Sequence, residues 1–392
     1  MSIPQMQAAP DLGTATPRDV LHAAGELAST IADRAAEIEA ARRVPPDLLE
    51  QLVHAGCFRL LMPGGHGGLG ADVVTGMRLF QSLARADTSV AWTVMIGGSS
   101  WCDLTGLPRG TFDAIFSRSD VITAGVINPT GSITACEGGY RVTGRWSFAS
   151  GCEHADLLFG NCVEDTGQAE PQLRVAVFAP DQVVIEDTWT TSGLRGTGSH
   201  HFRADGVVVP AARTFLPLAD EPCLDEPLVR IPPPALYSLE IAAVALGIAE
   251  GALDDILALA GAKVPLFAAA ALAANPTFQL ELARADTDLR AAHALLYEAA
   301  ETAWATATDR TDFTLEQRAR LRAAAVWATE RAAEVVDTAY RSGGGGALYA
   351  ESPLQRRFRD VHALTQHFLV KRDTLSTVGA ILAGQDINVM VF

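Results

Sequence analysis

Three side chains near the C-terminus carry groups that can transfer protons: Asp360, His362 and His367. Imidazole changes its charge close to neutral pH, so a histidine here could act as a general acid or base. We expect one amphipathic helix over this stretch, on which the seven residues from Asp360 to His367 make two turns along one face. Asp360 could therefore orient His367, although a salt bridge between helices would explain Asp360 equally well.

The other nucleophilic and metal-binding side chains favour structural roles. The six cysteines are scattered without a Cys-x-x-Cys pair, which is typical of reduced thiols in a cytoplasm. His200 and His201 are neighbours on an expected strand, where successive side chains face opposite sides, so no metal site is predicted. Cys152 follows Gly151 and is interpreted as a small packing residue rather than a nucleophile.

A glycine-rich stretch, Gly65 to Gly70, matches the G-x-G-x-x-G pattern of dinucleotide-binding proteins. That pattern binds a pyrophosphate only between a strand and a helix of a βαβ unit. Here the flanking sequence predicts helices and Pro63 stands just before the stretch. We therefore interpret it as a structural loop.

The composition describes a protein with a large core and an acidic surface. Of the 392 residues, 48% are hydrophobic and 19% are charged, which excludes a disordered or fibrous chain. The net charge of −16 would repel a phosphate backbone or an anionic membrane, so we expect neither nucleic acid nor membrane as a partner. No signal peptide or membrane-spanning stretch is visible, and we expect a cytoplasmic protein of two or three domains.

The pattern of residue types divides the chain into three parts. Residues 1–120 predict a helical domain, residues 121–216 a β domain and residues 217–392 a helical bundle. In the middle part, short runs rich in Val, Phe and Thr alternate with turns, which predicts an antiparallel sheet. Thr314 and Gln317 form the pattern of a capping box. The predicted helices cover residues 17–43, 46–55, 73–84, 89–97, 238–259, 276–307, 314–341 and 352 through the C-terminal region.

Several stretches follow one another in the order found in the acyl-CoA dehydrogenase superfamily. They are AGCFRLLMPGGHGGLGAD (55–72), RADTSVAW (85–92), YRVTGRWSFASG (140–151), GLRGTGSHHFRADGVVVPAARTF (193–215), ALGIAEGALD (245–254) and GGGGALYAESPLQRRFRDVHA (343–363). Together they resemble that superfamily over about residues 20–392. The resemblance implies a mainly α fold with a central β domain: an N-terminal helical domain, a middle antiparallel β domain and a C-terminal four-helix bundle.

The residue at the position of the catalytic base separates the branches of this superfamily. The dehydrogenases usually place a Glu about eight residues after the final Arg-Asp, and here His367 stands in that neighbourhood. The other position for the base, at the start of the first bundle helix, falls near Tyr237, and Glu240 three residues later is an imperfect substitute. The Arg-x-x-Phe-Gly motif that helps the dehydrogenases to hold FAD is also missing.

Two motifs fit a different branch: Arg-Asp-x-His (359–362) with a second histidine after it, and Trp-Ser-Phe-x-Ser-Gly-Cys (146–152). They resemble the oxygenase components of two-component flavin-dependent monooxygenases, which include phenol and seco-steroid hydroxylases, dibenzothiophene monooxygenase and amino-sugar nitrososynthases. The resemblance implies that reduced flavin, FADH2 or FMNH2, arrives from a separate NAD(P)H-dependent flavin reductase. With O2 it gives a C4a-hydroperoxyflavin, which hydroxylates or N-oxygenates a small-molecule substrate. A homo-oligomer, specifically a tetramer, is also implied. An acyl-CoA dehydrogenase or oxidase and a non-catalytic flavin-binding relative stay open as alternatives.

The same resemblance implies roles for individual residues. His367 is the active-site base or proton donor, and Asp360 is catalytic beside it. Ser150 stands where the family bonds flavin N5, and Phe148 where an aromatic ring stacks on the flavin. The flavin contacts implied are Phe148, Ser150, Gly343, Gly344 and Gly345.

The implied substrate contacts are Trp92, Ser100 and His362, although Trp92 would also suit the core and His362 a structural role. Ser100 ends the stretch Gly97-Gly98-Ser99-Ser100, where phenol hydroxylases of this branch often carry a histidine. Its absence weakens the case for a phenol and leaves N-oxygenation, or another ring substrate, open.

Overall fold

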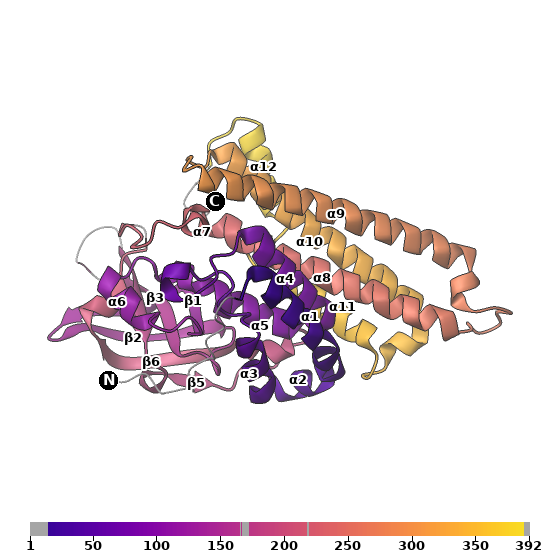
Figure 1. The fold of residues 1–392 in the computed structure, drawn as a ribbon, viewed down its shortest axis with the longest axis horizontal. Coiled ribbons are helices and arrows are strands. Elements are labelled where there is room, and N and C mark those ends of the chain that lie inside the picture. Colours follow the sequence, from indigo (N-terminus) through magenta and orange to yellow (C-terminus); the bar gives the residue numbers. More distant parts are fainter. Residues whose placement is uncertain (1–14, 165, 167–171, 218, 388–392) are drawn as a thin grey trace.

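The computed structural model describes residues 15–164, 166, 172–217 and 219–387. Its elements form an elongated molecule with the sheet at one end, the N-terminal helices in the middle and the long C-terminal helices extending beyond them (Figure 1). Within the described residues, no helix is both long enough and apolar enough to cross a membrane.

The N-terminal helices pack their apolar faces into the main core of the molecule. The helix expected over residues 17–43 was wrong at Arg34, where the chain leaves helical geometry. The Arg34 guanidinium donates to Glu37 at 2.9 Å and to Asp47 at 2.6 Å, so it joins three helices at this break. The helices are α1 (Pro17–Asp33), α2 (Ala35–Ala41), α3 (Pro46–His54), α4 (Val73–Ala86), α5 (Thr88–Ser99) and α6 (Arg109–Ile115).

Helix α5 lies in the interior, where it packs against α4, α8 and β1. Its start is fixed by Asp87, whose carboxylate accepts bonds from the N–H groups of Ser89 and Val90 at 2.9 and 3.0 Å. Eleven of its twelve residues are buried, and Ile96 is the exception. A nearly all-apolar sequence is what such an interior helix requires.

The sheet of the described residues has seven strands in the order β5-β6-β2-β1-β3-β4-β7. The expected antiparallel sheet was wrong at one pair, because β3 runs parallel to β1. After β2, residues 150–156 carry the chain to the other side of β1, where β3 starts beside the start of β1. The sequence could not predict this, because an alternating pattern shows which face a residue occupies but not the direction of the strand. The strands are β1 (Thr123–Cys136), β2 (Gly139–Ala149), β3 (Leu157–Glu164), β4 (Gln172–Phe178), β5 (Val184–Glu186), β6 (His200–Val209) and β7 (Thr214–Phe215).

The C-terminal helices follow the prediction except at the end of the chain. The capping box of Thr314 and Gln317 is confirmed, with hydrogen bonds of 2.8 and 3.1 Å. The expected fourth helix was wrong beyond Leu364, because short turns follow that bury Leu369 and Val370 in the main core. The helices are α7 (Pro227–Arg230), α8 (Pro233–Ala262), α9 (Pro276–Thr308), α10 (Leu315–Gly343), α11 (Pro353–Leu364) and α12 (Thr374–Leu382).

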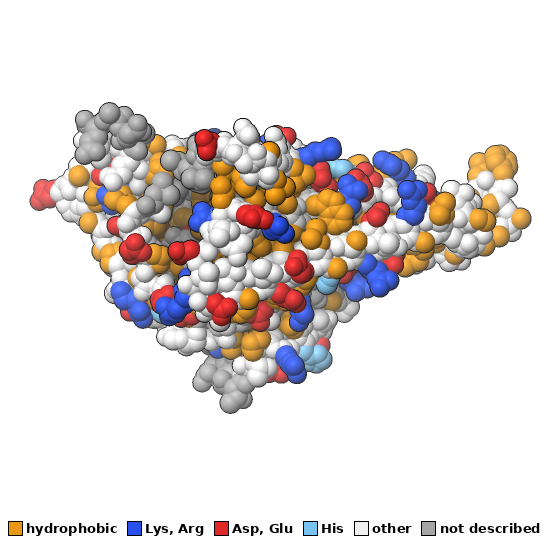
Figure 2. Space-filling view, turned by 90° about the horizontal axis from the view of Figure 1, so that it is seen from above, with side chains coloured by type: hydrophobic (Ala, Val, Ile, Leu, Met, Phe, Trp, Pro, Cys, Tyr) orange, Lys and Arg blue, Asp and Glu red, His pale blue; other side chains and the backbone are white. Residues whose placement is uncertain are grey.

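The surface carries mixed charge over most of the face seen in Figure 2, and hydrophobic side chains gather at the far end of the long helices. The loop from α8 to α9 supplies three exposed apolar residues, Val264, Leu266 and Phe267. Leu266 is 84% exposed and Phe267 is 99% exposed. Large apolar side chains are seldom so open on a monomer, which indicates a contact surface at this tip.

Candidate active site

The structure brings together three of the residues expected in the site: Trp92, Ser150 and His367. They come from α5, from the turn after β2 and from the turn after α11. The indole Nε1–H of Trp92 donates to Ser150 Oγ at 3.0 Å. The Trp92 and His367 rings lie 5.6 Å apart, centroid to centroid, at 64° to each other. Trp92 therefore touches both predicted residues.

Ser150 belongs to a chain of buried hydroxyl groups that the sequence analysis did not identify. Its Oγ lies 2.8 Å from Ser199 Oγ, which lies 2.6 Å from Thr197 Oγ1. Thr197 donates its proton to the carbonyl oxygen of Leu194 at 2.8 Å. The string Gly-Thr-Gly-Ser in the sequence was the available signal, because hydroxyls two residues apart can face one side.

The direction of these hydrogen bonds follows from the two ends of the chain. Because the Thr197 proton goes to Leu194, Ser199 must donate to Thr197, and Ser150 must donate to Ser199. Ser150 meanwhile accepts from Trp92. A hydroxyl has one proton and two lone pairs, so Ser150 Oγ keeps one lone pair with which to accept a further hydrogen bond.

Asp360 is in the neighbourhood of the site but does not act on His367. It is buried, and its Oδ1 accepts from the Leu194 N–H at 2.7 Å. The expected helical face shared with His367 is absent, since α11 ends at Leu364. Asp360 instead holds Leu194, whose carbonyl ends the hydroxyl chain and whose φ of 53° is left-handed. Burial and the nearby charge of Asp87 raise the pKa of Asp360 to about 6.

His367 is held as a neutral imidazole. Burial and the charge of Arg322 lower the pKa of His367 to about 4. The Leu369 N–H donates to His367 Nδ1 at 3.4 Å, so the ring proton lies on Nε2. Arg322, on α10, donates to the Leu369 carbonyl oxygen at 3.1 Å. One backbone residue thus connects the buried guanidinium to the imidazole.

Phe148 presents a flat apolar surface two residues before Ser150. Its side chain is 69% exposed, and its φ of 70° is a left-handed backbone conformation that L-residues seldom adopt. The ring meets Trp189 and His201 edge to face, at 6.1 and 6.4 Å. The Nδ1 of His201 is buried and has no hydrogen-bond partner among the described residues. An exposed ring with an unpaired polar atom beside it fits a planar heteroaromatic ligand such as flavin.

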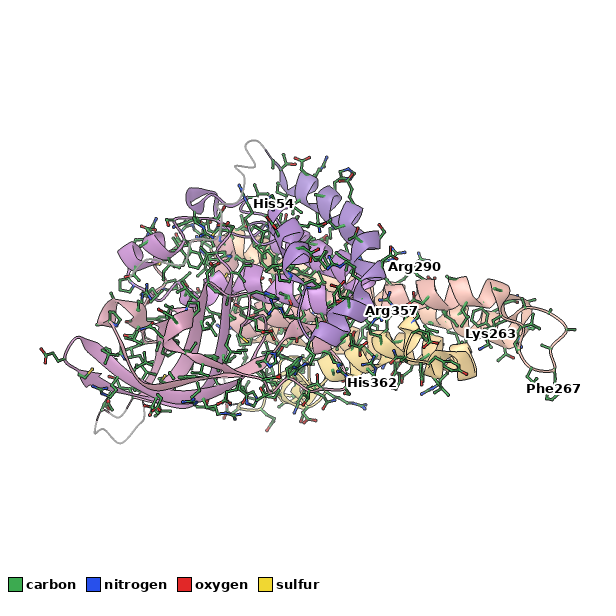
Figure 3. The ribbon with its side chains drawn as sticks, turned by 90° about the horizontal axis from the view of Figure 1, so that it is seen from below. His54, Lys263, Phe267, Arg290, Arg357 and His362 are labelled. Atoms are coloured by element: carbon green, nitrogen blue, oxygen red, sulfur yellow. The ribbon has the colours of Figure 1, made fainter. Side chains whose placement is uncertain are left out.

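Other predicted site residues lie apart from this cluster. His362 bonds Asp337 on α10 through Nε2, at 2.8 Å. The Lys263 ammonium donates to the Gly343 carbonyl, and Lys263 lies far along the bundle from the sheet, so Gly343, Gly344 and Gly345 do not reach Ser150 within one chain (Figure 3). Gly343, Gly344 and Gly345 are therefore remote from Ser150 in one chain, and His362 bonds Asp337 rather than a residue of the cluster.

Ser100 follows α5 and bonds to β1. Its hydroxyl lies 3.1 Å from the carbonyl oxygen of Thr123 and 2.6 Å from the Thr123 hydroxyl. It therefore fixes the end of α5 to the sheet, which is a structural contact. The predicted glycine-rich stretch forms a loop containing a short helical turn, Gly64–His66, with helices on either side rather than a βαβ unit. Among the described residues, no group of three or more His, Cys, Asp or Glu side chains could hold a metal ion.

Comparison with known proteins identifies the family of the chain. The acyl-CoA dehydrogenase N-terminal domain model matches residues 16–105, and the C-terminal domain model matches residues 239–372. Indole-3-acetate monooxygenase of Pseudomonas putida is 33% identical over 92% of each chain. The oxygenase component of an FADH2-dependent resorcinol hydroxylase of Rhizobium sp. is 28% identical over 90% of each chain. The chain belongs to the flavin-dependent monooxygenases of the acyl-CoA dehydrogenase superfamily.

The fold of this monooxygenase is also that of solved relatives. A 3-HSA hydroxylase from Rhodococcus sp. superposes with a TM-score of 0.88 at 28% identity, covering 95% of this chain and 99% of the other. The expected acyl-CoA dehydrogenase-like fold and the monooxygenase function are therefore confirmed. These relatives are a named monooxygenase and a named hydroxylase, which disfavours the dehydrogenase alternative.

Proposed function

We propose that this monooxygenase oxygenates a small aromatic substrate beside Trp92, with reduced flavin bound at Phe148 and Ser150 and delivered by a separate reductase. Reduced flavin, when bound, supplies the electrons that activate O2. The aromatic class of the substrate is supported by the two curated relatives, whose names specify indole-3-acetate and resorcinol. The aromatic and buried lining of the cluster suits such a ring.

The direction of the hydroxyl chain is the observation that carries the flavin assignment. Ser150 has given its proton to Ser199 and offers only a lone pair. Reduced flavin carries a hydrogen on N5 and can donate to that lone pair, whereas oxidised flavin presents a bare acceptor at N5. Two acceptors facing each other in a buried site are unfavourable. The site should therefore select the reduced form that the reductase delivers.

His367 supplies a fixed hydrogen-bond donor on the Trp92 side of the site. With Nδ1 accepting from Leu369, its Nε2–H can donate to an oxygen atom of a bound reactant. The low pKa keeps the imidazole from releasing an acidic proton into the site at neutral pH. Trp92 and the buried hydroxyls restrict water on the same side, which protects reactive oxygen species from premature protonation.

The predicted glycine contacts fit this proposal only if a second copy approaches. Gly343 to Gly345 lie beside Lys263 near the exposed tip of Leu266 and Phe267, remote from Ser150 of the same chain. Lys263 is a cation suited to a flavin phosphate. We infer a homo-oligomer, a tetramer by the family resemblance, in which the tip of one copy meets another copy.

The decisive experiment is oxygen-isotope labelling of the product that the 392-residue chain forms. The protein is mixed with reduced flavin under anaerobic conditions and then with ¹⁸O2 and a panel of indoles and phenols. We expect one ¹⁸O atom in a product, detected by mass spectrometry. Products that contain only oxygen from water, although reduced flavin is bound, would contradict the proposal.

A further inference from the structure

A second group of buried polar side chains lies at the other end of α5 from its start, where α5 meets α8. Glu240 on α8 is 0% exposed, and its Oε1 accepts from the Ser99 hydroxyl at 2.9 Å. Its other oxygen, Oε2, is buried and has no hydrogen-bond partner in the described part of the chain. Nearby, Asp103 accepts from the Tyr237 hydroxyl at 2.7 Å. A buried unpaired carboxyl oxygen costs free energy unless a ligand supplies the missing hydrogen-bond partner.

This group lies along α5 from the site residue Trp92. Ser99 follows Trp92 by seven residues, which is two helical turns on one face, or about 10 Å. Ile96 lies between them on the same face and is the residue of α5 that keeps partial exposure. Asp103 and Tyr237 are also partly exposed. Partly exposed side chains therefore lie along and beyond this interval of α5, and its length of about 10 Å matches a substrate of one or two rings.

The protonation of Glu240 decides what it can bind. Burial raises the pKa of Glu240 to about 8, and that of Asp103 to about 7. Asp103 ionises first, and its negative charge further favours the protonated form of Glu240. Tyr237 and Cys102, the other titratable groups here, have pKa values raised well above their ordinary values and stay neutral. Glu240 is therefore a neutral acid near pH 7.

The Ser99 bond places the Glu240 proton. Because Ser99 donates to Oε1, that oxygen acts as the carbonyl, and the acid proton lies on the unpaired Oε2. Oε2 is thus a hydrogen-bond donor without an acceptor. Among the described residues, the charge that acts on Glu240 is the anion Asp103, so a carboxylate ligand would be repelled there. A neutral hydroxyl or carbonyl oxygen fits best.

We propose that Glu240 is a specificity-determining residue that donates a hydrogen bond from Oε2 to a neutral hydroxyl or carbonyl oxygen of the aromatic substrate. This inference rests on the proposed function, because that function places the reacting part of the substrate beside Trp92. It differs from the role of a dehydrogenase base, which requires the ionised carboxylate. Glutamine can replace a donating acid but cannot replace a base, so the two roles are separable.

The test compares three ligands that share one ring system: β-naphthol, naphthalene and β-naphthoate. Their binding to the full-length protein, with reduced flavin and without O2, is measured by calorimetry at pH 7. We expect the native protein to prefer β-naphthol over naphthalene by about fivefold, the equivalent of one hydrogen bond, and to bind β-naphthoate more weakly than β-naphthol. Glu240→Gln should keep this preference, and Glu240→Leu should lose it.

The pH dependence gives a second, independent readout. The probe here is 2-acetylnaphthalene, because its carbonyl oxygen can only accept a hydrogen bond, whereas a naphthol hydroxyl could donate to the ionised carboxylate. Between about pH 7 and 9 the native preference for 2-acetylnaphthalene over naphthalene should fall, because Glu240 loses its donor proton. In Glu240→Gln the preference should stay constant over this range. Glu250→Gln is the matched control, since Glu250 is a carboxylate of the same helix that bonds Gln81 away from this group. It should behave as the native protein does.

Either of two results from the variants would overturn the inference: a preference for β-naphthol that survives in Glu240→Leu, or one that Glu240→Gln loses as completely as Glu240→Leu. A native protein that does not distinguish β-naphthol from naphthalene would overturn it too. Because these measurements involve no O2, they are separate from the labelling experiment. Failure to incorporate ¹⁸O overturns the proposed function, whereas failure of the naphthol preference in a protein that does incorporate it overturns this inference alone.

Discussion

Asp360 and Ser150 stand at the two ends of one path through the active site. Asp360 accepts from the N–H of Leu194, and the carbonyl of the same residue accepts from Thr197, which begins the hydroxyl chain to Ser150. The orientation of the Ser150 hydroxyl therefore depends on a carboxylate in α11. This connection gives Asp360 a positioning role in place of the catalytic role expected beside His367.

Replacing Asp360 by asparagine should change the pH dependence of stability. The folded pKa of about 6 lies above the ordinary value, so the protonated form stabilises the fold, and that stability is lost as pH rises from about 4 through 6. Asp360→Asn keeps an acceptor for Leu194 and cannot ionise. We expect its free energy of unfolding to exceed that of the native protein by about 1–3 kcal/mol at pH 8, and the difference to vanish near pH 4. Parallel urea-unfolding profiles of the two proteins from pH 4 to 8 would refute this.

Removing the Ser199 hydroxyl should weaken selection for reduced flavin. In Ser199→Ala the Ser150 proton is no longer committed, so Ser150 can donate to oxidised flavin as well. We expect the ratio of the oxidised to the reduced flavin Kd to fall by about fivefold, measured by anaerobic titration. Ser132→Ala removes a strand hydroxyl that bonds the Thr143 carbonyl and should leave the ratio unchanged. An unchanged ratio in Ser199→Ala would show that Ser150 does not discriminate by its proton.

Loss of the His367 imidazole should uncouple oxygen use from product formation. In His367→Ala we expect product to fall by about 10²–10³-fold, the usual contribution of one fixed hydrogen-bond donor, while oxygen is diverted to hydrogen peroxide. Flavin binding and the fold should survive, because Phe148 and Ser150 are untouched. His54→Ala, at an exposed position of α3, is the control (Figure 3). Full coupled turnover in His367→Ala would return His367 to a structural role.

Arg322 should control the charge state of His367. Replacing it with methionine removes a cation, so the pKa of His367 should rise from about 4 toward its ordinary value, with burial still holding it below that value. Arg322→Lys keeps the charge and should preserve the low pKa. The titration is followed by NMR of the imidazole, with Arg320→Met on the exposed side of α10 as the control. A His367 pKa that is the same in Arg322→Met and the native protein would show that the charge of Arg322 does not lower the pKa of His367.

The exposed tip should determine the oligomeric state. A charge at Phe267 would be buried in an interface between copies, so Phe267→Asp should shift the protein to smaller species in analytical ultracentrifugation. Val184→Asp introduces the same charge at an exposed apolar position of β5 and should not change the species present. If both variants sediment as the native protein does, the tip is not the interface.

The sequence predicted the parts of the site that local motifs encode. Ser150 and His367 could be named because each stands in a recognisable stretch, and the structure brings both to Trp92. The placement of His367 relative to Asp360 could not be predicted, since it depends on where α11 ends. That end is set by tertiary burial of Leu369 and Val370, which a one-dimensional pattern does not contain.

The hydroxyl chain shows a second limit of sequence reasoning. Thr197 and Ser199 are ordinary loop residues in sequence, and only the folded loop shows that Ser199 bonds Ser150 and that Thr197 bonds Ser199. The parallel pairing of β1 with β3 was missed for a related reason, because residue alternation is the same for either strand direction. Membership of a helix was predicted well wherever the helix was long, as over residues 276–307.

The burial of α5 fixes the distance between two parts of the site. Trp92 and Ser99 lie on one uninterrupted helix, which has a fixed rise per residue and is enclosed by neighbouring elements. The distance from Trp92 to Ser99, and so to the Glu240 side chain that Ser99 bonds, can therefore change only in steps of helical turns. Adapting the protein to longer or shorter substrates would require exchanging the side chains at the two ends of this interval or that of Ile96, which lies between them.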